Sequence, residues 1–466
     1  MAYGARTDAS DATRPTRLPI SSAGVEAGAI HRRVARDRRA RPTGLDWLPP
    51  VVALGTAITV AVGLAAAARG VELGADLPPF VASWEPRVHG LAVPAIALLG
   101  AAVLLAPRLL APSVSAPAFA AAAFGLALAG RLAVAVARGG PAGPYAVFDT
   151  HREAKNEYLP ALPALDYGPV WFLDRFAELV PSLPVHVAGH PPGLLLTLHL
   201  LGIDSAPGLG ALTIVPAALS VPLTYVLGRQ LLADDTRARI AALLAAFTPA
   251  ALLHGASSAD ALYAALGLLA AIALVARRRA ALLLGPALLA VASFFSWALL
   301  AVGAWAAIVV ARRDGIGRAA ALAAGCAGAV GVLYTALYAA FGFDPLGTLV
   351  ATEEVYRFSL ARLRPYAYWL FGSPAAFLVV LGLPVAWYAL KALAARHTVA
   401  LALAAVIVTA SVLGFTKAET ERIWLFLVPL ACLAAATVLP RGAARPVLAL
   451  IVAQALAAEL LLDTIW

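Results

Sequence analysis

The sequence has little charge. Only 13% of its 466 residues are Asp, Glu, Lys or Arg, whereas soluble globular domains average about 25%. It contains one methionine and two cysteines, Cys326 and Cys432. Both cysteines lie inside apolar blocks, which favours packed small side chains over a disulfide or a metal pair. Together with a mean hydropathy of +0.84, this composition excludes an ordinary soluble domain.

Glycine-rich nucleotide motifs are also missing, since neither a Walker pattern nor a Rossmann pattern occurs in the chain. We therefore expect no nucleotide cofactor. The net charge of +9 would suit a nucleic-acid partner, but the Lys and Arg residues stand mostly in short runs between apolar blocks. In that position they orient membrane helices, so we expect no nucleic-acid binding.

Apolar residues make up 62% of the chain and come in blocks of roughly 15–25, enough to cross a bilayer core. The pattern predicts an all-α, polytopic transmembrane bundle of about 13 helices. The basic segment 1–43 is expected to be a disordered cytoplasmic tail. Two additional N-terminal transmembrane helices fall in 44–112, and the main module covers 113–466. The expected location is the plasma membrane.

A long polar stretch, 139–207, is predicted to lie outside the cytoplasm. It contains the charged sequence VFDTHREAKNEY, with Asp149, His151 and Glu153. WFLDRFAELV follows with an amphipathic helical pattern, which predicts a surface helix. Next comes HVAGHPPGLLL, where two prolines after His190 predict a fresh helix start. The apolar segment 193–202 is too short to span and is expected to be a half-helix or interfacial helix.

Three further segments carry ionisable groups on the predicted outer side. HGASSAD ends in Asp260, and KAETERIW contains Lys417, Glu421 and Arg422. YRFSLARLRPYAYW sets arginines among aromatic side chains, an arrangement suited to lipid headgroups or phosphate; its arginines are Arg357, Arg362 and Arg364. Chemistry, if the chain performs any, is expected on this side.

The order of these motifs resembles the GT-C superfamily of membrane glycosyltransferases over about residues 114–440. The likeness is greatest to the protein O-mannosyltransferase and aminoarabinose-transferase branch and to actinobacterial cell-envelope relatives. The resemblance implies a sugar donor carried on polyprenyl phosphate and an acceptor glycan, lipid or protein of the cell envelope. It also implies one acidic residue in the first large outer loop, matched by Asp149, and a second in the next outer loop, matched by Asp260.

The family likeness and the residues together suggest specific roles. Asp149 is the first candidate for the base that activates the acceptor hydroxyl, Glu153 is the second, and Asp260 is the further catalytic acid. Asp149 and Asp260 are also candidate ligands of a divalent cation, Mg or Mn. The expected substrate-binding residues, whose cations would face the departing phosphate, are His151, His190, Arg357, Arg362, Arg364, Lys417, Glu421 and Arg422. The sugar is expected to be mannose or arabinose-like.

Other interpretations fit the same residues. Asp149 would also suit a solvated loop, and Asp260 a helix N-cap. The KAETERIW charges could form a salt-bridged rim. At the level of function, the alternatives are a lipid-linked sugar transporter or flippase and a non-catalytic scaffold of envelope assembly. The enzyme interpretation requires Asp149, Asp260 and the later arginines to gather around one hollow.

Overall fold

The computed structural model describes residues 45–278 and 280–464, so the predicted tail 1–43 lies outside the described residues. Residues from Trp47 onward form one compact unit, and 77% of the structure is helical. A single small antiparallel pair of strands occurs in the described part of the chain. It joins β1 (Ser83–Trp84) to β2 (Leu462–Asp463), with Ser83 opposite Asp463. The prediction of a mostly helical structure is therefore confirmed.

The helices of the first half include four long ones, the last of which follows a series of short ones. In chain order they are α2 (Leu48–Ala67), α3 (Ala92–Leu109), α4 (Ala116–Gly139), α5 (Pro169–Asp174), α6 (Phe176–Leu179), α7 (Val185–Ala188), α8 (Gly193–Leu201), α9 (Ala206–Leu231), α10 (Asp235–Phe247) and α11 (Pro249–Leu253). Short 3-10 turns join several of them: η1 (Gly140–Ala142), η2 (Ala146–Phe148), η3 (Ala154–Asn156), η4 (Leu159–Leu165) and η5 (Val180–Ser182).

The second half continues the bundle. Its helices are α12 (Asp260–Val275), α13 (Ala281–Ser293), α14 (Leu300–Asp314), α15 (Ile316–Phe341), α16 (Pro345–Phe358), α17 (Tyr366–Val380), α18 (Leu383–Ala394), α19 (Thr398–Leu413), α20 (Thr420–Ile423), α21 (Val428–Val438) and α22 (Ala444–Leu461). The 3-10 turns here are η6 (Trp297–Leu299), η7 (Leu360–Leu363), η8 (Leu425–Leu427) and η9 (Arg441–Ala443).

Six of the described helices are long and apolar enough to cross a membrane, or seven if the bent pair α17–α18 counts as one span. These helices indicate a membrane-embedded protein. Apolar side chains on α2 and α15 support this, because Leu54 is 61% and Val332 72% exposed, which suits lipid contact. The predicted count of about 13 is not confirmed. Four further apolar helices have only 10–17 residues, whereas a span needs about 20.

The polar breaks in the sequence fall where the helices end. The apolar block near 240–276 lies in α10, α11 and α12, with α10 and α11 separated at Thr248 and α11 and α12 separated by the loop 254–259. The predicted half-helix is α8, which starts directly after the two prolines and ends at Gly202 in a left-handed conformation, as is common at helix C-termini. The predicted surface helix is present but interrupted at Arg175 into α5 and α6, with Phe172 and Phe176 buried.

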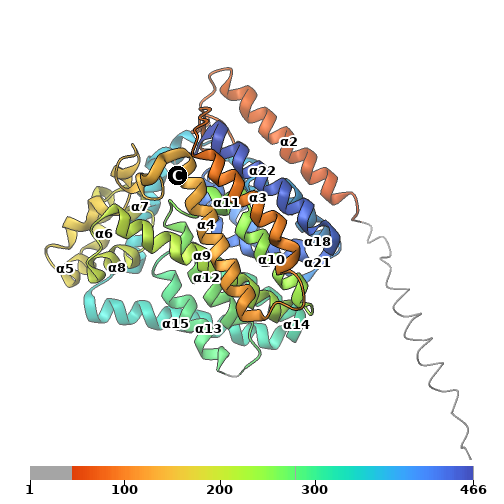
Figure 1. The fold of residues 1–466 in the computed structure, drawn as a ribbon. Coiled ribbons are helices and arrows are strands. Elements are labelled where there is room, and N and C mark those ends of the chain that lie inside the picture. Colours follow the sequence, from red (N-terminus) through yellow and green to blue (C-terminus); the bar gives the residue numbers. More distant parts are fainter. Residues whose placement is uncertain (1–44, 279, 465–466) are drawn as a thin grey trace, which may run out of the picture. The chain divides into compact units, whose positions relative to one another are not determined.

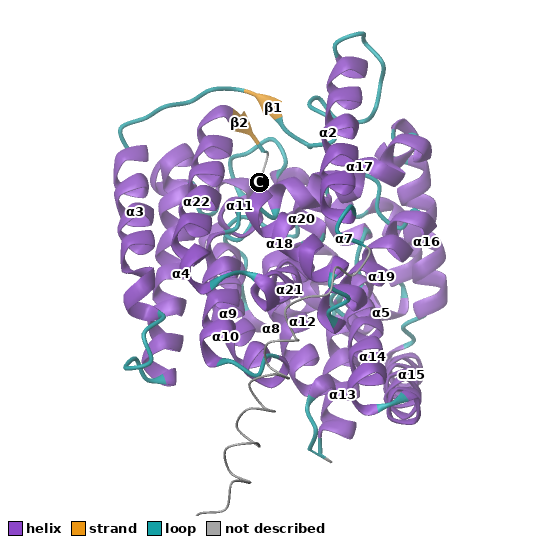
Figure 2. Ribbon diagram, turned by 90° about the vertical axis from the view of Figure 1, so that its right-hand side faces the viewer, coloured by secondary structure: helices purple, strands orange, loops and turns teal. Residues whose placement is uncertain are grey.

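Helix α9 occupies the middle of the bundle, where it packs against α4, α10 and α12 (Figures 1 and 2). From there the packing continues through α12 to α13 and through α10 to α21 and α18. The predicted N-terminal pair belongs to the same compact unit, since α2 packs on α17 and α18, and α3 on α4 and α22. Much of the buried interface consists of alanine, whose small side chain permits close helix approach.

A buried cluster of charged side chains

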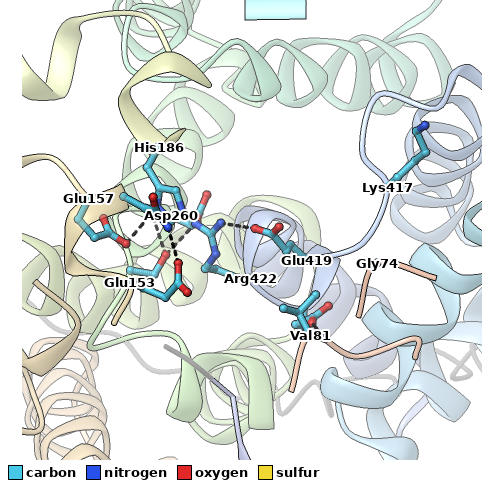
Figure 3. A network of polar contacts seen from close by, with 12 residues as sticks. Gly74, Val81, Glu153, Glu157, His186, Asp260, Lys417, Glu419 and Arg422 are labelled. Atoms are coloured by element: carbon cyan, nitrogen blue, oxygen red, sulfur yellow. Dashed lines mark hydrogen bonds and ion pairs between the residues drawn. The ribbon is translucent and has the colours of Figure 1, made fainter. Parts of the chain in front are cut away.

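A group of ionisable side chains is buried where loops and short helices meet the start of α12. Asp260 is the first residue of α12, Glu419 directly precedes the single turn of α20, and Arg422 lies within that turn. Glu157 precedes η4, and His186 lies on α7. Figure 3 shows these five residues in one network of polar contacts. Three segments far apart in the sequence thus converge.

Arg422 is at the centre of this cluster. One guanidinium nitrogen donates to a carboxylate oxygen of Asp260 at 2.5 Å, and the other donates to Glu419 at 2.7 Å. The side chains of Arg422 and Asp260 are only 7% and 5% exposed. The Ser258 hydroxyl also donates to Asp260 at 2.8 Å. Asp260 therefore accepts hydrogen bonds from two neighbours in a site that excludes bulk water.

Arg364 extends the cluster toward the N-terminal helices. It donates to Glu419 at 2.8 Å, to the carbonyl oxygen of Lys417 at 2.9 Å and to that of Gly74 at 3.4 Å. These protein partners hold the guanidinium in place, which favours a positioning role for Arg364. The Lys417 amino group donates to the carbonyl oxygen of Ala361 at 3.1 Å and points away from Asp260 in Figure 3.

Charge and burial oppose each other within the cluster. Burial alone would raise the pKa of Glu419, but the nearby charges of Arg422 and Arg364 outweigh it and lower that pKa to about 2. Burial likewise disfavours the charged form of Arg422, yet the carboxylates of Asp260 and Glu419 leave its pKa above the ordinary value. The two groups therefore stay ionised and hold each other in place.

The backbone before α20 is unusual. Ala418 and Glu419 both have positive φ angles, 66° and 58°, a conformation that costs non-glycine residues roughly 1 kcal/mol or more each. The turn directs Glu419 between Arg364 and Arg422, three residues ahead of the latter. Strain of this kind persists where the surrounding contacts over-determine the conformation, which is typical of functional sites.

Glu157, which is buried, and His186, which is partly buried, form a second pair beside the first. The His186 Nδ1 atom lies 3.0 Å from a Glu157 oxygen, and the Glu157 side chain is 1% exposed. The Tyr158 and Tyr263 hydroxyls lie 2.7 Å apart. The His190 ring lies at a tilt against the Tyr263 ring, with centroids 5.1 Å apart, and burial lowers the pKa of His190 to about 4. The charges of Asp260 and Arg422 also act on His190, which places it beside the cluster.

Glu421 contacts the loop between α2 and α3. One of its oxygens accepts from the backbone N–H of Val81 at 2.7 Å, and its side chain is buried. Burial raises the pKa of Glu421 to about 7. Trp369 donates to the carbonyl oxygen of Leu73 at 2.9 Å. The α2–α3 loop is thereby held against the elements that carry Arg364 and Arg422.

Only part of the charged sequence VFDTHREAKNEY lies at the cluster. Asp149 is exposed at the end of η2, and its carboxylate has no hydrogen-bond or ion-pair partner among the described residues. Glu153 accepts from the Asn156 side chain at 2.6 Å and is drawn in the network of Figure 3. His151 accepts from the backbone of Glu153 at 3.2 Å, and burial lowers its pKa, opposed by the charge of Asp463.

The two remaining predicted arginines stay at the surface. Arg357 pairs with Glu353 at 2.6 Å one turn earlier on α16, with side chains 65% and 50% exposed. Arg362 is exposed on η7. Neither has a contact with the Asp260 cluster among the described residues. Of the three arginines in this stretch, the structure brings only Arg364 to the cluster.

The predicted metal ligands, Asp149 and Asp260, have no ready ligand set around them among the described residues. Within residues 45–278 and 280–464, no group of three or more His, Cys, Asp or Glu side chains is arranged to hold a metal ion. Asp260 is already engaged by Arg422 and Ser258, while Asp149 is exposed. The residues therefore do not form a ready ligand set, and we derive no chemical step through a metal.

Sequence reasoning named Asp260, Arg364 and Arg422 but did not single out Glu157, Tyr158, Tyr263 or Glu419 as site residues. Glu157 and Tyr158 stand at the end of the charged stretch, directly before the apolar run LPALPAL. This change from a charged to an apolar sequence is a signal that Glu157, the last charged residue before it, is buried. Glu419 lies three residues before Arg422, a spacing at which opposite charges meet on one helical turn.

Compared with models of known protein families and with curated proteins, the sequence matches none of them.

Proposed function

We propose that this chain is a membrane glycosyltransferase that moves a sugar from a polyprenyl-phosphate donor to a cell-envelope acceptor on the outer face of the plasma membrane. The proposal rests on the resemblance in motif order together with one structural observation. That observation is the buried Asp260–Arg422–Glu419–Arg364 chain of contacts beside Glu157 and His186. Buried charges that are paired in this way inside a membrane protein commonly mark substrate paths or catalytic sites.

The chemistry needs a cation near the departing phosphate and a base near the acceptor hydroxyl. Arg422 supplies a fixed positive charge, and hydrogen bonds to Asp260 and Glu419 orient its guanidinium group. Arg364 fixes Glu419 from the other side. Lys417, partly exposed at the edge, is suited to a phosphate that approaches from the lipid.

Two carboxylates compete for the role of base, since Glu153, the second candidate from the sequence, is already held by the Asn156 side chain. Asp149 is the candidate implied by the family likeness, and its exposure leaves it accessible to an acceptor. Glu157 is one of the three carboxylates of the cluster and is held 3.0 Å from His186. Transfer by either would take the proton from the acceptor hydroxyl as the sugar carbon–oxygen bond to phosphate breaks and the new glycosidic bond forms.

The test is transfer in proteoliposomes. Purified protein receives radiolabelled decaprenyl-phosphate mannose or arabinose with envelope extract as acceptor, and incorporation into products insoluble in organic solvent is measured. We expect Asp260→Asn to lower the rate at least about 100-fold. The matched control Glu353→Gln, which removes a carboxylate from the exposed pair with Arg357, should retain it. Equal rates for wild type and Asp260→Asn, or no transfer from either donor, would refute the proposal.

The same assay separates the two candidate bases. If Asp149 is the base, Asp149→Asn abolishes transfer while Glu157→Gln retains measurable activity. The reverse order assigns the role to Glu157. Thermal unfolding of each variant controls for misfolding, because Glu157 is buried and its replacement alters packing as well as charge.

A second candidate, transport of a lipid-linked sugar, is favoured by one observation. Helices α17 and α18 meet at an angle of 114° across a break of at most four residues, where Gly382 has a φ of 91°. Broken helices are frequent in transporters. Movement of the labelled donor between leaflets without any acceptor would support this candidate, whereas the enzyme leaves the donor in its own leaflet.

A further inference from the structure

A group of arginines lies at the opposite end of α12 from the buried charged cluster. Between Asp260 and Asp344 the sequence contains six arginines and only one acidic residue, Asp314. These arginines stand in or beside two connections, the loop between α12 and α13 and the turn between α14 and α15. Helix α15 is long and apolar enough to span a membrane, and it starts here at Ile316. The two connections therefore lie at a membrane surface.

Asp314 gathers three arginines from both connections. Arg313 donates to its carboxylate at 2.7 Å and Arg277 at 3.2 Å, while the Nε atom of Arg318 lies 3.9 Å away. Backbone carbonyl oxygens at the end of α12 accept from Arg313 at 2.7 Å and from Arg318 at 3.3 Å. The carboxylate and these carbonyl oxygens hold three guanidinium groups together, but only one of their positive charges is neutralised.

The excess positive charge is accessible from outside the protein. The Arg277 side chain is 66% exposed, whereas that of Asp314 is 11% exposed, and Arg278 is exposed next to Arg277. Apolar side chains follow directly. Leu283 in the first turn of α13 and Ile316 at the start of α15 are 80% and 81% exposed. Positive charge at the helix ends is thus combined with exposed apolar side chains on the same helices.

The arginines around the loop between α9 and α10 differ from this group. Four of them share two carboxylates: Arg229 and Arg239 pair with Asp235, and Arg237 and Arg441 pair with Asp234. Around Asp314, five described arginines accompany a single carboxylate. Positive charge at helix ends orients membrane helices, but that role does not require three guanidinium groups to be gathered around one carboxylate.

We propose that the Asp314 surface, formed by residues 275–278 and 312–318, binds the headgroup of an anionic phospholipid. Arginines match a phosphate group in charge and in the geometry of their donors, and basic clusters directly beside a membrane span attract anionic lipids. The exposed Leu283 and Ile316 suit acyl chains, which a soluble phosphate ester lacks. The surface lies at the other end of α12 from Asp260, so it is separate from the proposed glycosyl transfer and stands whether or not that proposal holds.

The experiment uses the full chain purified in a neutral detergent. The protein is equilibrated with an equal mixture of phosphatidylglycerol and phosphatidylcholine, and native mass spectrometry counts the lipids of each kind that stay bound. We expect phosphatidylglycerol to be retained in preference. One arginine near the membrane surface contributes about fivefold in affinity for anionic lipid, so Arg277→Gln with Arg278→Gln should lower the preference about 10- to 30-fold. Both side chains are exposed, so this variant is expected to fold.

Arg229→Gln with Arg441→Gln is the matched control. It removes the same charge from two side chains of the α9–α10 group that are 56% and 63% exposed. We expect this variant to keep most of the preference for phosphatidylglycerol. Equal losses in the two double variants, or no preference in the wild type, would overturn the proposal, because net charge alone would then account for the binding.

A competition experiment separates a lipid from a soluble ligand of the same chemistry. Glycerol phosphate carries the phosphate group without acyl chains. An excess of it should leave phosphatidylglycerol bound to the wild type, since the exposed apolar side chains contact only the lipid. Displacement of the lipid by glycerol phosphate would assign the Asp314 surface to a soluble phosphate ester and contradict the proposal.

Discussion

Two ion pairs of this protein have almost the same length and opposite surroundings. Arg422 meets Asp260 at 2.5 Å with side chains 7% and 5% exposed, and Arg357 meets Glu353 at 2.6 Å with side chains 65% and 50% exposed. The exposed pair exchanges its contact freely with water and salt. The buried pair cannot, so removal of one partner leaves a charge without solvation. Distance alone therefore says little about the importance of an ion pair.

The largest expected effect follows from Arg422→Gln. This change leaves Asp260 buried without its cation and removes the link to Glu419. We expect a loss of about 3–5 kcal/mol in the free energy of unfolding, measured by thermal or denaturant unfolding in detergent. The double variant Arg422→Gln with Asp260→Asn should recover part of that loss, because it no longer buries an unpaired carboxylate. Absence of any recovery would show that the pair is not coupled.

The structure also shows which parts of the chain were predictable. Long apolar blocks were a good guide to helices, since α2 (Leu48–Ala67) and α9 (Ala206–Leu231) are each built from one such block. The number of spans was not predictable in the same way. Apolar segments such as α12 and α21 are cut short by loops, and their length depends on packing that composition does not encode.

The sequence predicted several ionisable residues of the candidate site, but not which of them contact one another. Position in predicted outer loops selected Asp260 and Arg422, which the structure joins. The same reasoning treated Arg357 and Arg364 alike, although one is exposed and the other buried. They lie seven residues apart across the end of α16 and η7, and only the tertiary fold decides which of them faces Glu419.

A smaller effect is expected from Glu421→Gln, and it depends on pH. The pKa of Glu421 is raised from 4.5 to about 7, so the folded state holds this proton more tightly than the unfolded state. Stability should therefore fall as pH rises from about 4.5 to about 7 and stay constant above that. The Gln side chain keeps an oxygen for the Val81 N–H, so the variant loses this dependence.

The measurement compares wild type and Glu421→Gln at pH 5 and pH 8. We expect similar melting temperatures at pH 5 and an advantage of roughly 2–4 °C for the variant at pH 8. The nearby charge of Glu419 raises the pKa of Glu421, and that of Arg364 lowers it. Glu419 and Arg364 are both present in the wild type and in the variant, so they do not differ between the two proteins. An advantage of equal size at both pH values would rule out titration of Glu421 as the cause.

The hydroxyl pair of Tyr158 and Tyr263 provides a neutral counterpart to the buried ion pair. The two oxygens lie 2.7 Å apart in the interior. Tyr158→Phe leaves the Tyr263 hydroxyl without this partner, and we expect a loss of about 1–2 kcal/mol. Replacement of both tyrosines by phenylalanine should cost less than the sum of the single losses. Strict additivity, measured by unfolding of all four proteins, would show that the hydroxyls do not interact.

The smallest expected effect is that of Arg357→Gln, the exposed counterpart of Arg422→Gln. Its pair with Glu353 is a surface contact one helical turn apart, worth about 0.3–0.5 kcal/mol and weakened further by salt. Unfolding in low and high salt should show a difference from wild type only at low salt. If Arg357 instead binds the phosphate of the donor, stability stays unchanged while the apparent KM for the lipid-linked sugar rises several-fold. Transfer assays at varied donor concentration thus decide whether this exposed arginine serves the substrate although it lies outside the buried cluster.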